Sequence, residues 1–167
     1  CELTTRQCSL ECAGENSCQG STFVCGLNTC TVACTGYRTN PCQNLVVHGE
    51  LANSLRFSVE VNGGERAMNQ NEYYQRYGAR WHRHGDNAAK EADVRCPSHG
   101  GACAVSCKDA ESNHPGAYNH YDRSFGKRGN PRETCRGIRV DASDSVTASS
   151  EVTVRCDGAG DYLCKEM

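Results

Sequence analysis

The sequence predicts an all-β protein, a disulfide-stapled parallel β-helix (a solenoid) with two long loop insertions. Three observations support this prediction: the cysteines recur at repeated spacings, short stretches alternate apolar and polar residues, and Gly, Asn, Asp and Ser separate those stretches. Fourteen cysteines in 167 residues exceed the level of about 8% at which a disulfide scaffold becomes the leading class. A repeated unit with an apolar strand centre is typical of stacked coils that share one continuous core.

The cysteines fall into units with the spacing Cys-x(4–7)-Cys-x3-Cys-x(5–27)-Cys. Between the second and third cysteine of each full unit lies a tripeptide centred on an apolar residue: Leu10, Val32 or Val105. Each full unit therefore predicts an apolar strand core bounded by cysteines. The units are Cys1, Cys8, Cys12 and Cys18; Cys25, Cys30, Cys34 and Cys42; Cys96, Cys103, Cys107 and Cys135; and a partial one, Cys156 and Cys164.

Alternation of apolar and polar residues predicts eight short, half-buried strands. Successive turns of about 20–25 residues fit a parallel β-helix, in which each coil packs its inward residues against its neighbours. An antiparallel sandwich is the alternative, but Asn62-Gly63 offers the one good tight hairpin turn. The predicted strands are residues 21–25, 29–34, 44–48, 55–62, 92–96, 103–107, 137–141 and 150–156.

The two halves of the chain match at an offset of 93 residues, which indicates an internal duplication. At this offset Gly63 falls where Cys156 stands, so one coil is predicted to have lost its disulfide there. The matched pairs are Cys42 and Cys135, Val47 and Val140, Val59 and Val152, and Val61 and Val154.

We expect one domain, residues 1–167, because a solenoid of this length occupies the whole chain. Two cysteine-free insertions, residues 64–91 and 108–134, are rich in Arg, Tyr, His, Gly and Asn. Insertions in a solenoid project as loops, commonly from the binding face. In the first, aromatic residues at helical spacing predict a short helix. The aromatic residues expected at an interface are Tyr73, Tyr74, Tyr77, Trp81, Tyr118 and Tyr121.

The repeat also narrows the disulfide pairing. The second and third cysteines of a unit lie four residues apart on a strand, about 13 Å, whereas bridged Cα atoms lie about 4.4–6.8 Å apart. Pairing first with third would leave both cysteines of the partial unit without partners. Pairing between equivalent cysteines of adjacent coils, such as Cys12 with Cys34 or Cys8 with Cys30, remains the alternative. The predicted pairs are Cys1–Cys8, Cys12–Cys18, Cys25–Cys30, Cys34–Cys42, Cys96–Cys103, Cys107–Cys135 and Cys156–Cys164.

Composition excludes several kinds of partner and site. A net charge of −2 gives no basis for a polyanionic partner such as nucleic acid, and no apolar run is long enough to span a membrane. The absence of a Cys-x2-Cys knuckle favours disulfides over structural zinc. Disulfides persist in oxidising compartments, so we expect an extracellular or cell-surface protein. No signal peptide is visible, and the chain begins on Cys1 as a mature or partial product would.

One candidate metal site lies in the first insertion. His82, His84 and Asp86 occupy alternate positions, and in an extended segment all three would point the same way, which suits a divalent transition metal. Solvated loop residues or interface hydrogen bonds are the alternative interpretation, and we expect no cofactor. The second insertion offers a similar set: His114, His120 and Asp122.

The sequence predicts no catalytic residue. Oxidised cysteines are poor nucleophiles, and no hydrolase, metalloprotease or phosphate-loop motif occurs. Parallel β-helices include polysaccharide lyases, and Asp141 and Asp144 leave a sugar-active role open as a minor alternative. The aromatic insertions favour carbohydrate binding by stacking as the main alternative.

Residues 16–36 resemble the cysteine-rich repeats of extracellular surface proteins of algae and other protists. The resemblance rests on Cys-Gln-Gly-Ser-Thr-Phe-Val-Cys followed by Cys-Thr-Val-Ala-Cys. It covers residues 1–47 well, residues 92–107 and 135–140 moderately, and neither insertion. It implies a cell-surface or matrix component, like those of flagellar hairs (mastigonemes) and other extracellular filaments.

Together these observations predict a non-enzymatic structural subunit of an extracellular filament, coat or matrix. The chain starts on the first cysteine of a unit and stops within another. We therefore expect copies of the chain to associate head to tail, an open contact that makes filaments. A fragment of a longer repeat protein is the simpler alternative.

Overall fold

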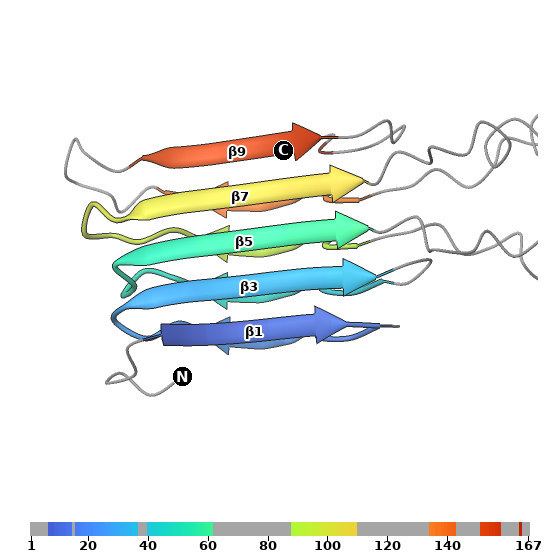
Figure 1. Ribbon diagram of the computed structural model, residues 1–167, viewed down its shortest axis with the longest axis horizontal. Helices are drawn as coiled ribbons and strands as arrows, with labels where there is room; N and C mark the ends of the chain where they lie inside the picture. The colour runs from blue at the N-terminus through green and yellow to red at the C-terminus, as the bar shows by residue number, and fades with distance from the viewer. Residues whose placement is uncertain are drawn as a thin grey trace, which may run out of the picture.

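The computed structural model describes residues 7–14, 16–36, 40–61, 88–109, 134–142 and 151–157, together with Cys164. Within these ranges the chain is all-β, with nine strands and no helix. The strands form two parallel sheets, and successive strands along the chain alternate between the sheets (Figure 1). The all-β, cysteine-rich prediction with parallel strands is therefore confirmed.

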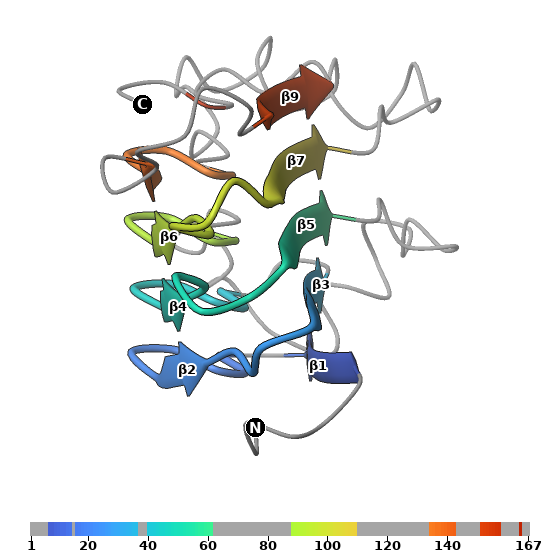
Figure 2. The same cartoon turned by 90° about the vertical axis from the view of Figure 1, so that its left-hand side faces the viewer.

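The larger sheet has the strand order β1-β3-β5-β7-β9, and the smaller sheet has the order β2-β4-β6-β8. Figure 2 shows the two sheets facing each other, with the strands of each stacked along one direction. We call a strand of the larger sheet and the smaller-sheet strand that follows it a layer, so that β1 and β2 form the first layer. The strands are β1 (Gln7–Ala13), β2 (Thr22–Val24), β3 (Thr29–Gly36), β4 (Val46–His48), β5 (Ser54–Val61), β6 (Asp93–Arg95), β7 (Ala102–Asp109), β8 (Arg139–Asp141) and β9 (Val152–Asp157).

All seven described strand pairs are parallel, so the antiparallel alternative is wrong. Eight strands coincide with the predicted ones to within two residues at each end. The strand missing from the predicted set is β1, in which Cys8, Leu10 and Cys12 face the interior. Its alternation contains a single aliphatic residue, and this weakens the periodic signal.

The core lies between the two sheets and consists of inward rows that run from layer to layer. One row contains Leu10, Val32, Phe57, Val105 and Val154, which pair in register across adjacent strands. Its three inner members are at most 1% exposed. Cysteines and small residues make up much of the remaining core, so the core is narrow.

The strand register corrects the single offset of 93 residues. In the smaller sheet Val47 pairs with Val94 and Val94 with Val140, so the offset of 93 holds there. In the larger sheet Cys107 pairs with both Val59 and Cys156, an offset of 97 from position 59 to position 156. The segment between β8 and β9 is therefore four residues longer than its counterpart. Consequently Val59, not Gly63, stands where Cys156 stands.

The turns after β1, β3, β5 and β7 share a left-handed residue at the same position. This central residue has a φ of 51–58° at Cys18, Cys42, Ala89 and Cys135. The N–H of Ala89 donates to the carbonyl of Pro41 at 2.8 Å, just as the N–H of Cys42 donates to the carbonyl of the previous layer at 2.9 Å. Residues 88–91 thus belong to the repeating turn, although the sequence placed them in the 64–91 insertion.

Candidate functional site

One column of disulfides runs along the larger sheet. Each bridge joins the end of a strand to the left-handed residue of the next turn, with Cα–Cα distances of 5.8–6.4 Å. These are the same pairs that the cysteine spacing predicts. They are Cys12–Cys18, Cys34–Cys42, Cys107–Cys135 and Cys156–Cys164.

A second column lies at the other end of the strands. Cys25–Cys30 joins the end of β2 to β3, and Cys96–Cys103 joins the end of β6 to β7. Cys8 is disulfide-bonded; its predicted partner, Cys1, lies outside the described residues. Each described bridge closes a turn between consecutive segments of the chain: those of the first column lie within one layer, and those of the second column close the turn from one layer to the next.

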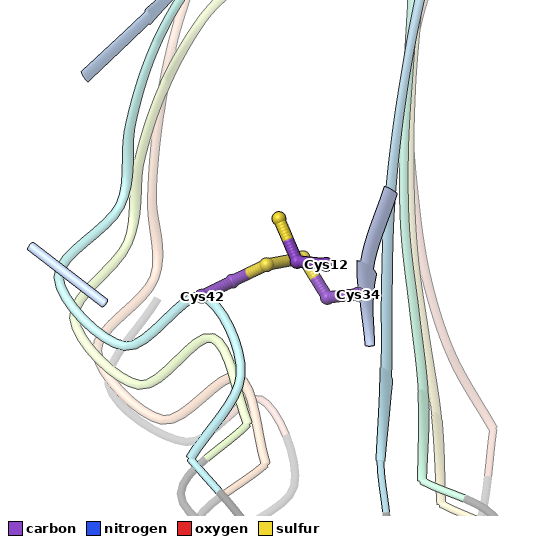
Figure 3. A group of neighbouring side chains, drawn as sticks. All are labelled: Cys12, Cys34 and Cys42. Atoms are coloured by element: carbon purple, nitrogen blue, oxygen red, sulfur yellow. A yellow bond between two sulfur atoms is a disulfide. The ribbon is translucent and has the colours of Figure 1, made fainter. Parts of the chain in front are cut away.

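Neighbouring disulfides of the first column come close to each other. The sulfurs of Cys12, Cys34 and Cys42 lie within 4.8 Å of one another (Figure 3), and the same holds for Cys107, Cys135 and Cys164. Although Cys12 and Cys34 are paired in the β1–β3 register, each is bonded within its own layer. Metal ligation needs thiolates, and no cysteine among the described residues is free. The close sulfurs are therefore stacked disulfides.

Strand β5 of the third layer takes part in neither kind of bridge, although β1, β3, β7 and β9 each contain bonded cysteines. Val59 and Ala89 stand where the first column has cysteines, and Gly49 and Leu55 stand where the second column has them. A Cβ on Gly49 would lie 2.7 Å from Leu55 Cδ2 and 2.5 Å from the Arg95 carbonyl. The leucine side chain therefore occupies the space that a bridge fills in the adjacent layers, and apolar packing replaces covalent closure.

The two outer strands of the larger sheet differ from the inner ones. Val152 and Val154 on β9 pair with buried Cys103 and Val105 and occupy the same inward rows, yet they are 39% and 40% exposed. Within the described ranges the smaller sheet ends at β8, so no strand of it faces these valines. At the other end, Leu10 on β1 is partly buried and packs against the core. The larger sheet therefore presents an apolar end at β9.

Charged side chains pair across β4 and β6. His48 Nδ1 lies 3.1 Å from Glu50 Oε1, and Arg95 lies 3.5 Å from the same oxygen and 3.8 Å from Asp93 Oδ2. Partial burial of Glu50 opposes its ionisation, but a backbone hydrogen bond and the interactions with His48 and Arg95 outweigh that effect. The pKa of Glu50 is therefore lowered from 4.5. This cluster stabilises the ionised carboxylate and fixes the turn after β4.

Most of the sequence-predicted site residues lie outside the described part of the chain, so their roles remain predictions. This holds for the metal candidates of both insertions, for the interface aromatics and for Asp144. Asp141 is described: it ends β8 and pairs with Arg95 in the strand register. The undescribed candidates are His82, His84, Asp86, His114, His120, Asp122, Tyr73, Tyr74, Tyr77, Trp81, Tyr118 and Tyr121.

No protein family, curated protein or solved structure matches this chain. Among the described residues, no helix is both long and apolar enough to cross a membrane. The features that sequence reasoning missed are the Val59–Ala89 substitution for a disulfide and the exposed inward valines of β9. The alternation of apolar and polar residues predicted β9 as a strand, but the exposure of its valines depends on which strand lies opposite them.

Proposed function

We propose that this protein is a secreted, non-enzymatic structural subunit of an extracellular filament, coat or matrix. In this proposal the layers are coils of a disulfide-stapled parallel β-helix, and the end strands of the larger sheet join copies of the chain. A solenoid adds each coil through the same contacts as the last, so its ends accept further coils unless they are capped.

The repeated hydrogen bonds support the solenoid. In the turns, the N–H groups of Cys42, Ala89 and Cys135 each donate to the preceding layer at 2.8–2.9 Å. In the smaller sheet, the N–H of Val46 donates to the carbonyl of Ser21 at 2.9 Å, and the N–H of Arg139 donates to the carbonyl of Ala92 at 2.8 Å. Each layer thus repeats the contacts of the layer before it, as coils on one axis do.

The disulfides support a location outside the reducing cytosol. Thirteen cysteines, all those described, are bonded, and they provide a large part of the buried core. Disulfides in such number form and persist in oxidising compartments and are rare in cytosolic proteins. Disulfides also stabilise a fold whose core is narrow against unfolding. This stability suits a structural subunit outside the cell.

The observation that carries the proposal is the exposure of Val152 and Val154. Inward residues of inner strands are almost fully buried, whereas these two remain about two-fifths exposed. Burial of apolar surface stabilises by about 25 cal/mol per Å². A further strand packed over this end would gain that contribution, and an edge strand with unpaired backbone groups can accept one.

Sedimentation velocity and negative-stain electron microscopy of the oxidised chain test this proposal. We expect rod-shaped assemblies whose length increases with protein concentration, because an open head-to-tail contact has no closed end point. A monomer across the whole concentration range, or an assembly that stops at two copies, contradicts it.

A further inference from the structure

We propose that β1 of a second copy adds to the outer edge of β9, parallel and in the register that β1 keeps with β3. This inference rests on the proposed assembly and specifies its contact. Within the described residues, β1 and β9 each have one strand neighbour, and these two strands are therefore the outer strands of the larger sheet.

The inward rows continue across this contact. In the β1–β3 register Cys12 pairs with Cys34, and in the β7–β9 register Cys107 pairs with Cys156. Setting Cys12 against Cys156 keeps the cysteines of the first column aligned. The same setting places partly buried Leu10 against Val154. The row that holds Val32, Phe57 and Val105 inside one copy thus extends into the next, and Leu10 of the second copy lies beside its exposed member.

Outward-facing residues of β1 and β9 carry opposite charges at the proposed contact. In the aligned outward row the inner strands carry small residues, whereas Glu11 and Arg155 occupy the two ends. Both end residues are exposed, and β1 on β9 sets them directly opposite each other. Cross-strand opposite charges stabilise a sheet. The full row is Glu11, Ala33, Ser58, Ser106 and Arg155.

The protein already contains an outward ion pair of this geometry. Glu60 and Lys108 pair in the β5–β7 register, and their charged atoms lie 3.6 Å apart. Arg155 is held by Asp157 of its own strand, with Nε and Oδ2 2.8 Å apart. A guanidinium has five N–H donors, so Arg155 has donors left for Glu11 of a second copy while it keeps Asp157.

Charge reversal tests the contact. Glu11→Arg and Arg155→Glu each place like charges opposite each other between identical copies. We expect each variant alone to associate about tenfold more weakly, since like charges replace an attractive cross-strand pair. An equimolar mixture should recover wild-type assembly to within about twofold, because each variant then meets the opposite charge at both of its ends. Sedimentation velocity at low ionic strength gives the association constants, and 1 M NaCl should shrink the differences.

Two matched controls change the net charge by the same amount elsewhere. Glu91→Arg alters an exposed turn residue, and Arg56→Glu alters an exposed residue on inner strand β5. Both controls should assemble as the wild type does. Circular dichroism of all four variants separates weakened association from misfolding, because the variants should keep the same β signal.

Zero-length crosslinking locates the contact directly. In an Arg155→Lys chain, a carbodiimide activates the Glu11 carboxylate, and the amine introduced at position 155 forms an amide with it as the carbodiimide becomes a urea. Peptide mapping should identify the link between positions 11 and 155 in assemblies. If assemblies form without this link, and if neither charge reversal changes the association constant, this inference is overturned but the structural role stays in place. A chain that never assembles overturns both.

Discussion

The turns repeat the same backbone conformation with different residues, and some of these residues adopt it at a cost in free energy. The residue two places after the central turn residue also has a positive φ, of 62° at Gly20, 55° at Asn44, 56° at Glu91 and 64° at Gly137. Glycine and asparagine adopt this conformation readily, whereas other L-residues lose about 1 kcal/mol or more. Glu91 is therefore strained.

We expect Glu91→Gly to stabilise the fold by about 1 kcal/mol, because it removes the side chain from a left-handed position. The gain is reduced by the greater freedom of glycine in the unfolded chain. Denaturant unfolding of the oxidised protein measures the change. Gly137→Ala is the control and should destabilise the fold. The added Cβ would lie 3.5 Å from Glu91 Cγ, an ordinary van der Waals distance, so the left-handed backbone conformation alone opposes this substitution. An unchanged midpoint for both variants would contradict this interpretation.

The carboxylate of Glu50 gives a pH dependence of stability. Its pKa is lower in the folded state than the usual 4.5, so folding favours the ionised form. The contribution is fully present above the unfolded pKa and is lost as the pH falls through the folded pKa. We expect Glu50→Gln to be less stable than the wild type at pH 7, and the difference to shrink in acid. Thermal unfolding between pH 7 and pH 2 measures it, and a difference that grows in acid would reverse the assigned sign.

At the scale of the element, the layers tolerate exchange of a disulfide for apolar packing. Val59 and Ala89 are 1% and 0% exposed, and they occupy the same strand and turn positions as the cysteine pairs on either side of them. The strand register holds the two positions together, whether or not a covalent bond joins them. The backbone therefore places positions 59 and 89 as it places the cysteines of a first-column disulfide.

We expect Val59→Cys with Ala89→Cys to form a disulfide that continues the first column. A bridge that closes a loop of about 30 residues stabilises by about 3.6 kcal/mol in the chain-entropy description. Peptide mapping without reduction verifies the bond, and denaturant unfolding measures the gain. Val59→Cys alone, which cannot form the bridge, is the matched control. A free thiol at both positions, or a midpoint below that of the parent, would show that the two layers are not equivalent there.

The whole molecule depends on its disulfides because the core is narrow. Of the 24 buried hydrophobic residues among the described ones, 10 are cysteines and Phe57 is the one aromatic residue. Each bridge contributes about 2–4 kcal/mol, and the whole stability of a typical domain is about 5–15 kcal/mol. We therefore expect folding to require the disulfides.

We expect complete reduction and alkylation to unfold the chain at 25 °C, with loss of the β signal in far-ultraviolet circular dichroism. Mild reduction should open Cys156–Cys164 first, because Cys156 is exposed and Cys164 is only partly buried, and then Cys12–Cys18, because Cys18 is only partly buried. Both belong to outer layers. Quantified alkylation by mass spectrometry gives the order of opening. Retention of the native spectrum after full alkylation would show that apolar packing suffices.

Much of the fold follows from local spacing. A disulfide spans about 6 Å, which excluded bonds between cysteines four residues apart on a strand, and the partial unit argued against pairing first with third; the six described pairs agree with that reasoning. Alternation likewise located the strands and their inward faces, because side chains on a strand alternate between its two faces. These constraints act over a few residues, and a sequence displays them directly.

Only the tertiary structure decided the register between distant strands. The offset of 97 residues in the larger sheet, the equivalence of Ala89 with Cys42, and the alignment of Glu11 with Arg155 all depend on hydrogen bonds between strands that are far apart in the chain. Segments of unequal length between strands break any single sequence offset. Exposure of Val154 is decided the same way, because burial depends on which strand lies opposite and not on the side chain itself.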